Sequence, residues 1–290
     1  MEGYEMTDLA LEKKANDQKR QKTELKRKEK IGEAIVSEII LDDADKDGPE
    51  RYITIEQGSL WDKEGQDLDE ITDIISCELT ALVKSVCQKA PNKDFSILVA
   101  GLGNSEITAD AIGPLTVKNL TVTRHLKNFE PNIYADIGRC GISAFSPGVL
   151  GQTGIESAEL ILGAVKTSSP DLVIAVDALA ARSCERLASV VQISDAGIRP
   201  GSGIGNMRSE ISKKSLGIPV ISIGVPTVVN SSTLVCDVLH SAGINKIDGD
   251  IERVLESGRS FFVTPKESDI MTKKIAIIIA ESIEKAFSIG

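Results

Sequence analysis

Short apolar runs alternate with longer segments whose apolar residues recur every three or four positions. The runs at 95–100, 172–176, 190–193 and 220–223 are bounded by polar or glycine-rich turns and predict buried strands. Helical spacing predicts helices over 68–89, 109–126, 155–166, 231–241 and 266–287. Strands separated by helices and tight loops indicate βαβ units with right-handed crossovers. We therefore expect an α/β fold, a three-layer sandwich whose mostly parallel sheet is covered by helices on both faces.

The first 60 residues follow a different pattern. Residues 13–30 are rich in Lys and Arg, are helix-prone and lack an apolar stripe after Leu11, so we expect 9–30 to form a polar surface arm. Two apolar runs, 35–41 and 52–55, flank the turn-rich stretch 42–49. That stretch resembles the start of an EF-hand loop, but it lacks the glutamate at position twelve, so it predicts a hairpin turn.

Composition narrows the class of protein. The chain has 290 residues, of which 41% are hydrophobic, which is enough for one large core or two modest ones. Because only 3% of the residues are aromatic, the core must be built from Ile, Val, Leu and Ala. A net charge of -10 argues against general nucleic-acid binding. The 5 cysteines show no C-x-x-C spacing and there are 2 histidines, which indicates reduced structural thiols and no metal site. With no signal-peptide pattern and no apolar run of membrane length, we expect a soluble cytoplasmic protein.

Two aspartates follow predicted strands. Asp110 comes after the strand 95–100 and a glycine-rich turn, and Asp177 comes directly after the strand 172–176. In an open α/β sheet, chemistry collects outside the carboxyl ends of the strands, where two carboxylates can share a proton and activate water. Each acid also has a structural alternative: Asp110 as an ordinary first-turn residue, and Asp177 as the partner of Arg182 in an ion pair.

The glycine-rich turn before Asp110 resembles a dinucleotide fingerprint. Glu106 stands where the third glycine belongs, and an acid there would repel a pyrophosphate, so a nucleotide site is disfavoured. We expect the glycines instead to present Asp110 at the start of a helix with Thr108 as its N-cap. The glycine-rich loops 147–154 and 200–206 either border the same crevice or serve as connections.

The same stretches resemble the spore germination protease family. The matches run in the same order from about residue 95 to about residue 270, and many ordered matches are far more specific than any single one. They are Val99–Asn104, Asp110–Pro114, Thr123–Leu126, Pro147–Glu156, Asp177–Ser183, Gln192–Asp195, Pro200–Gly203, Gly217–Val220, Pro226–Val229 and Val263–Glu267.

The resemblance implies a fold akin to the hydrogenase-maturation proteases, a phosphorylase/hydrolase-like fold. It implies an endopeptidase that degrades the small acid-soluble proteins coating spore DNA, acting as a homotetramer in the cytoplasm of the spore core. We expect no cofactor, no metal, no membrane contact and no direct contact with nucleic acid. The essential aspartates of the family fall on Asp110 and Asp177. Two departures are Ala109, where the family has proline, and a shorter stretch between Ser241 and Val263.

The N-terminus carries a pattern that resembles the family's cleavage sites. In Thr7-Asp8-Leu9-Ala10-Leu11-Glu12, an acid is followed by an apolar residue, a small one and a second acid two positions on. The family is made as self-processing zymogens, so the resemblance implies cleavage between Asp8 and Leu9. Residues 1–8 are then a propeptide, and 9–290 form a single peptidase domain.

The expected reaction is hydrolysis by a water held between Asp110 and Asp177, one acid ionised and the other protonated. Which acid plays which role stays open, because a coupled pair titrates as a unit. A second hypothesis is a metal-assisted maturation peptidase related to the hydrogenase-maturation proteases, with His125 or His240 as a doubtful third ligand. A third is a non-catalytic module that binds peptides in the acidic crevice.

Overall fold

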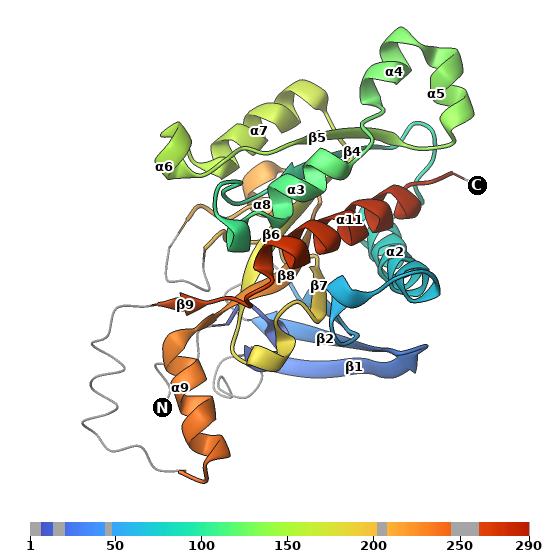
Figure 1. The fold of residues 1–290 in the computed structure, drawn as a ribbon. Coiled ribbons are helices and arrows are strands. Elements are labelled where there is room, and N and C mark those ends of the chain that lie inside the picture. The colour runs from blue at the N-terminus through green and yellow to red at the C-terminus, as the bar shows by residue number, and fades with distance from the viewer. Residues whose placement is uncertain (1–6, 14–20, 44–47, 202–207, 245–260, 290) are drawn as a thin grey trace.

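A single sheet organises the chain, and the computed structural model describes it over residues 7–13, 21–43, 48–201, 208–244 and 261–289 (Figure 1). The order of the strands is β1-β2-β3-β7-β8-β6-β4-β5, with β9 paired to β8. The strands are β1 Gln21–Ile31, β2 Ala34–Asp43, β3 Glu50–Glu56, β4 Ser96–Gly101, β5 Gly141–Phe145, β6 Leu172–Ala181, β7 Val190–Ser194, β8 Val220–Asn230 and β9 Phe262–Val263.

Helices cover both faces of the sheet. Helices α2, α3 and α11 contribute to the larger hydrophobic core on one face, and α7 and α8 pack into a smaller core on the other (Figure 1). The helices are α1 Ala10–Lys13, α2 Gln66–Cys87, α3 Ile112–Asn119, α4 Arg124–Phe129, α5 Pro131–Ile137, α6 Leu150–Thr153, α7 Ser157–Ser168, α8 Lys213–Leu216, α9 Ser231–Ser241 and α11 Ser268–Ala286, with short 3-10 turns η1 Leu60–Asp62, η2 Thr108–Asp110 and η3 Cys184–Arg186. The predicted α/β class and its three layers are confirmed.

Alternate residues of a single buried strand pack into different hydrophobic cores. In β4, Ile97 and Val99 pack into the larger core, while Leu98 and Ala100 pack into the smaller one. Successive strand residues point to opposite faces, so a strand buried on both faces reads as an unbroken apolar run. Where one face of the sheet carries polar residues, this alternation places the polar residues of neighbouring strands side by side on that face.

The expectation of a mostly parallel sheet is wrong, because the sheet is mixed. Strands β5, β4, β6 and β8 are parallel, whereas β7 runs antiparallel to both β8 and β3. A parallel crossover needs about a dozen residues or more. The connection 182–189 between β6 and β7 holds only the turn η3, so the chain reverses direction there.

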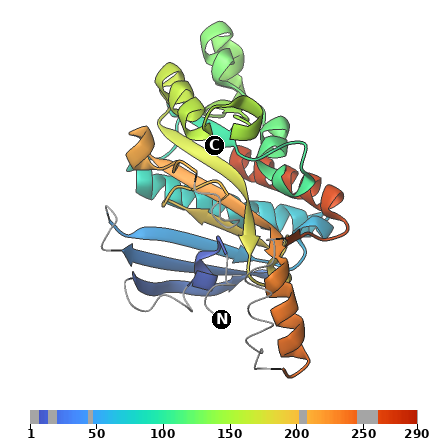
Figure 2. The same cartoon turned by 90° about the vertical axis from the view of Figure 1, so that its left-hand side faces the viewer.

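The N-terminal strands form the antiparallel end of the sheet. Figure 2 shows β1, β2 and β3 side by side at the end away from α4 and α5. The helix-prone interpretation of residues 13–30 is wrong for 21–30, which belong to the edge strand β1 and carry exposed charged side chains. Charged side chains on an edge strand discourage pairing with other chains. The predicted hairpin is confirmed by its flanking strands, and residues 44–47 of its turn lie outside the described residues.

The predicted helix 109–126 is shorter than expected. The turn η2 precedes α3, which ends at Asn119, and α4 begins at Arg124. Thr123 in the gap is buried: its hydroxyl donates to the carbonyl of Cys140 and accepts from the N–H of Ile142. Thr108 makes no cap, because it begins η2 and no side chain caps α3. β-Branched residues at 121–123 favour this break.

Candidate active site

Asp177 lies within the parallel half of the sheet rather than at a strand end. Strand β6 continues to Ala181, so the predicted boundary at Val176 is too early. Val176 packs into the larger core, and the alternation of the strand turns Asp177 to the opposite face. The strand pairing aligns Asp177 with Gly224 of β8 and Gly224 with Gln192 of β7. One row of the sheet therefore carries a buried carboxyl, a glycine and a buried amide.

Acidic neighbours surround the Asp177 carboxyl. Burial raises the pKa of Asp177 well above its usual value, and the charges of Asp110 and Asp8 raise it further. The N–H of Ala178 donates to Oδ1 of Asp177 at 2.9 Å, and this hydrogen bond lowers the pKa. An ion pair with Arg182 would lower the pKa, and the charges that act on Asp177 are acids instead. The site favours the protonated form of this carboxyl.

Asp110 is held by a loop that leaves β4. It is the last residue of η2, and its Oδ2 accepts the N–H of Asn104 at 2.7 Å. Burial raises the pKa of Asp110, and the bond from Asn104 opposes that rise. Gly103 has φ +107°, and a Cβ there would lie 2.0 Å from the carbonyl oxygen of Asp110. The glycine-rich turn therefore presents the acid, as the sequence predicts.

Threonine hydroxyls from β8 and α11 contact the turn η2. Thr227 donates to the carbonyl of Ala109 at 2.6 Å, and the Thr272 hydroxyl, which donates to Ser268 at 2.6 Å, also lies 3.2 Å from the carbonyl of Thr108. Ala109 thus lies on η2 and not at the first position of α3. The backbone that carries Asp110 is anchored to β8 and α11 without a helix cap.

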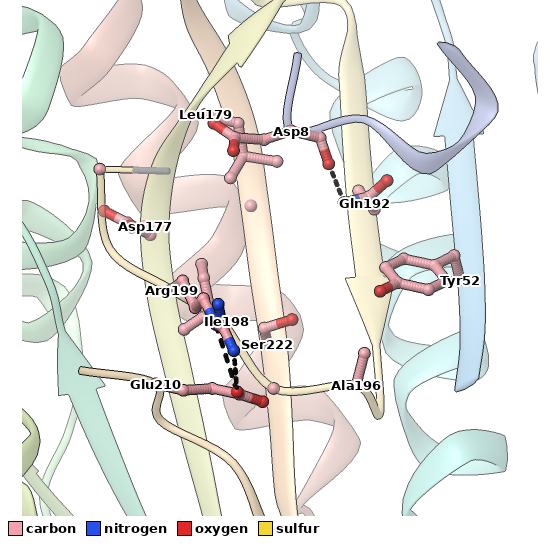
Figure 3. Close-up of a pocket in the computed structure, with 13 residues that line it drawn as sticks. Asp8, Tyr52, Asp177, Leu179, Gln192, Ala196, Ile198, Arg199, Glu210 and Ser222 are labelled. Carbon is pink, nitrogen blue, oxygen red and sulfur yellow. Dashed lines mark hydrogen bonds and ion pairs between the residues drawn. The ribbon is translucent and has the colours of Figure 1, made fainter. Parts of the chain in front are cut away.

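The two predicted acids face a common space. Asp110 and Asp177 both line a cavity of about 100 Å³, together with Arg208 and residues of the predicted glycine-rich loops. Asp177 also lines a larger cavity of about 290 Å³ (Figure 3), which Asp8 and Gln192 border as well. The structure thus brings Asp177 together with Asp110, 67 positions earlier in the sequence, and with Asp8, 169 positions earlier.

The N-terminal segment lies along the end of β6 next to this cavity. The N–H of Asp8 donates to the carbonyl of Ala180 at 3.0 Å, and the N–H of Ala180 donates to Oδ2 of Asp8 at 2.9 Å. Leu9 is fully buried among Leu179, Ala181 and Val190. The backbone and both side chains of the predicted cleavage site are therefore seated in the protein.

Gln192 is a site residue that sequence reasoning did not single out. Its Nε2 donates to the carbonyl oxygen of Asp8 at 3.3 Å (Figure 3), and its Oε1 accepts the N–H of Ala10 at 2.8 Å. One amide side chain therefore spans the bond between Asp8 and Leu9. The signal was a polar residue inside the apolar run Val190–Ile193, where burial demands a hydrogen-bonding partner.

Other residues with possible chemistry lie elsewhere. His125 is on α4 and His240 is on α9. Over the described ranges, no three His, Cys, Asp or Glu side chains gather as ligands for a metal ion. No helix in those ranges combines the length and apolar character needed to cross a bilayer. Part of the predicted loop 200–206 lies outside the described residues, as does the shortened stretch 245–260.

Comparison with known proteins gives consistent matches. A sequence model described as germination protease matches residues 2–242. A germination protease of Caldanaerobacter subterraneus is 43% identical over 261 residues, covering 82% of this chain and 78% of the relative. Those of Bacillus velezensis and a Geobacillus species are 44% and 48% identical, covering 73% and 66% of this chain. The chain spans only 58% and 50% of those two relatives.

Proposed function

The chain belongs to the germination protease family, and we propose that it is an endopeptidase whose first substrate is its own N-terminal segment. The proposal rests on the position of the Asp8–Leu9 peptide bond. Asp8 lines the same cavity as Asp177, and the charge of its carboxyl acts on Asp177. Cleavage there removes residues 1–8 as a propeptide and leaves 9–290 as a single peptidase domain. Residues 1–6 lie outside the described residues.

The neighbours of the bond hold it for attack. Gln192 donates to the carbonyl oxygen of Asp8, so its amide polarises the carbonyl whose carbon is attacked. The exchange of hydrogen bonds between Asp8 and Ala180 fixes the residue before the bond. Leu9 fixes the residue after the bond through its apolar surroundings. Holding a reactant in one orientation removes part of the entropy cost of the reaction.

The two aspartates then divide the proton transfers. The N–H of Asn104 supports the ionised form of Asp110, which suits it to take a proton from water. Burial and acidic neighbours favour the protonated form of Asp177, which suits it to give a proton to the substrate. The water oxygen bonds to the carbonyl carbon of Asp8, the C–N bond breaks, and the nitrogen of Leu9 leaves as an amine.

The resemblance extends the proposal to other substrates. We infer that the same site initiates degradation of small acid-soluble DNA-coating proteins in the cytoplasm of the spore core, and that the protein acts as a homotetramer. A protein substrate fits a site that already holds a segment of protein chain. No cofactor, metal or direct contact with nucleic acid enters the proposed reaction.

Intact mass of the full chain tests the proposal. We expect loss of residues 1–8 and a new start at Leu9, and we expect Asp110→Asn and Asp177→Asn each to stop it. Asp94→Asn is the matched control, since the Asp94 side chain is 97% exposed. Near-normal cleavage in either folded site variant contradicts the pair. Loss of activity with a chelator and its return with metal would favour the metal-assisted alternative. Binding of small acid-soluble proteins without fragments would favour a binding module.

A further inference from the structure

A β-bulge interrupts the pairing of β6 with β8 beside the candidate active site. Leu179 of β6 pairs with Pro226 of β8. The next residue of β6, Ala180, pairs with Val228, so Thr227 is one extra residue on β8. A bulge leaves its extra residue out of the regular ladder and re-aims its side chain, and bulges are common next to active sites. The bulge therefore gives Thr227 a position that a regular strand would not offer.

The hydroxyl of Thr227 reaches the turn that carries Asp110. Thr227 is fully buried, and its hydroxyl donates to the carbonyl of Ala109 at 2.6 Å. Ala109 is the residue directly before Asp110 in η2. The Thr272 hydroxyl of α11 lies 3.2 Å from the carbonyl of Thr108 and donates within its own helix at 2.6 Å. Of these two threonines, Thr227 thus makes the shorter bond to η2.

The bulge also lies next to the strand that carries Asp177. Asp177 pairs with Gly224, three residues before Thr227 on β8. Ala180, opposite the bulge, binds Asp8 through both its N–H and its carbonyl. The strand with one acid, the turn with the other acid and the N-terminal segment therefore meet at the bulge.

Asp110 belongs to a turn and not to the sheet, so its distance from Asp177 depends on how that turn is held. Both acids line one cavity of about 100 Å³. The N–H of Asn104 orients the Asp110 carboxylate within the loop, whereas the hydroxyl of Thr227 fixes the turn against β8. A misplacement of about 1 Å can cost about 10²-fold in rate. The bond from Thr227 therefore acts at a point where small shifts matter.

We propose that Thr227 is a positioning residue whose hydroxyl, aimed by the bulge, holds η2 so that Asp110 stays at the cavity it shares with Asp177. The inference rests on the proposed function, because it concerns the acid that takes a proton from water in that reaction. The hydroxyl acts on the backbone of η2, so its loss slows the chemical step and leaves the binding of a substrate peptide unchanged. Serine at this position keeps the hydroxyl and therefore keeps the rate.

The test uses the processed chain and a synthetic peptide that copies residues 1–16. Thr227→Val keeps the branched shape of the side chain and removes the donor. We expect kcat to fall about tenfold with KM unchanged, the scale of one lost hydrogen bond. Thr227→Ser retains the parent kcat. Thr116→Val is the matched control, since Thr116 is also fully buried and its hydroxyl donates to the carbonyl of Ile112 within α3. Its kcat stays at the parent value.

Three results overturn the positioning role while leaving the proposed protease intact: an unchanged kcat in folded Thr227→Val, a loss that appears in KM instead, or a Thr227→Ser chain as slow as Thr227→Val. If no chain cleaves itself or the peptide, the proposed function fails, and hydrogen exchange decides the positioning role alone. The amide of Asp110 donates to the carbonyl of Ile107 at 2.8 Å and closes the turn. Faster exchange of that amide in Thr227→Val than in Thr116→Val supports the role, and equal exchange overturns it.

Discussion

Asp177 and Gln192 lie on either side of Gly224 in one row of the sheet, and the Asp8–Leu9 bond rests beside that row. The carboxyl comes from β6 and the amide from β7, which the antiparallel reversal of β7 brings to the same face. Gly224 contributes no side chain of its own, and the side chain of Leu179 packs over it. The row thus combines a carboxyl whose raised pKa favours the protonated form with an amide that donates a hydrogen bond to the Asp8 carbonyl.

Replacement of Gln192 tests the amide. Gln192→Ala removes the donor to the carbonyl of Asp8 and the acceptor for the N–H of Ala10. We expect self-cleavage to slow by about 10²-fold, the scale of losing one donor to a developing oxyanion. Intact mass against time measures it. Gln88→Ala is the control, because the Gln88 side chain is exposed and donates to the carbonyl of Ser85. A rate within a factor of two (roughly) of the parent chain would contradict the role.

Replacement of Gly224 by alanine tests how closely the Leu179 side chain packs over β8. A Cβ at Gly224 would lie 2.5 Å from Cδ1 of Leu179, which contacts Leu9. We expect Gly224→Ala to lower the free energy of unfolding by about 1–3 kcal/mol through overpacking. In Gly224→Ala with Leu179→Ala, the added methyl fills part of the space that Leu179 vacates, so the combined loss is smaller than the sum. Urea unfolding of the four chains measures this, and strictly additive losses would show that the two positions do not interact.

The placement of Asp110 and Asp177 at one cavity could be predicted because the signals are local. A short apolar run followed by an acid, as at Asp177, places that acid on a sheet whatever the rest of the chain does. The glycine-rich turn before Asp110 likewise has a local reason, since only a residue without a Cβ fits at Gly103. The protonation preferences of the two acids depend on burial and on each other, which spacing along the chain does not report.

The missed features depend on distant partners. Residues 21–31 are rich in charge and have no apolar stripe, so no periodicity marks them as a strand; β2 supplies the pairing. The direction of β7 follows from the short connection 182–189 and not from its own composition. Gln192 and Glu12 make their hydrogen bonds only when the segment Asp8–Lys13 lies against β6 and β7. Contacts between residues so far apart in the sequence cannot be inferred from local patterns.

Substitution of Gly103 tests how Asp110 is positioned. In Gly103→Ala the new Cβ meets the backbone oxygen of Asp110, which cannot rotate away, and φ +107° is unfavourable for alanine. We expect η2 to shift and self-cleavage to fall by about 10²-fold, as proton transfer depends on geometry. Gly151→Ala is the matched control, because nothing lies within 4 Å of its Cβ. Equal activity of the two alanine variants would mean that Gly103 does not set the position of Asp110.

The raised pKa of Asp177 predicts how stability changes with pH. Burial and the charges of Asp110 and Asp8 raise the pKa in the folded state above the value of about 3.9 expected for an unfolded chain. The folded state therefore binds more protons than the unfolded state between those two pKa values, and stability falls as pH rises through that window. Asp177→Asn removes this loss. We expect the variant to melt higher than the parent chain at neutral pH and the difference to vanish below the unfolded pKa. Thermal unfolding of the two chains across this range measures it. A difference that is constant with pH, or largest in acid, would show that Asp177 is not held in its protonated form.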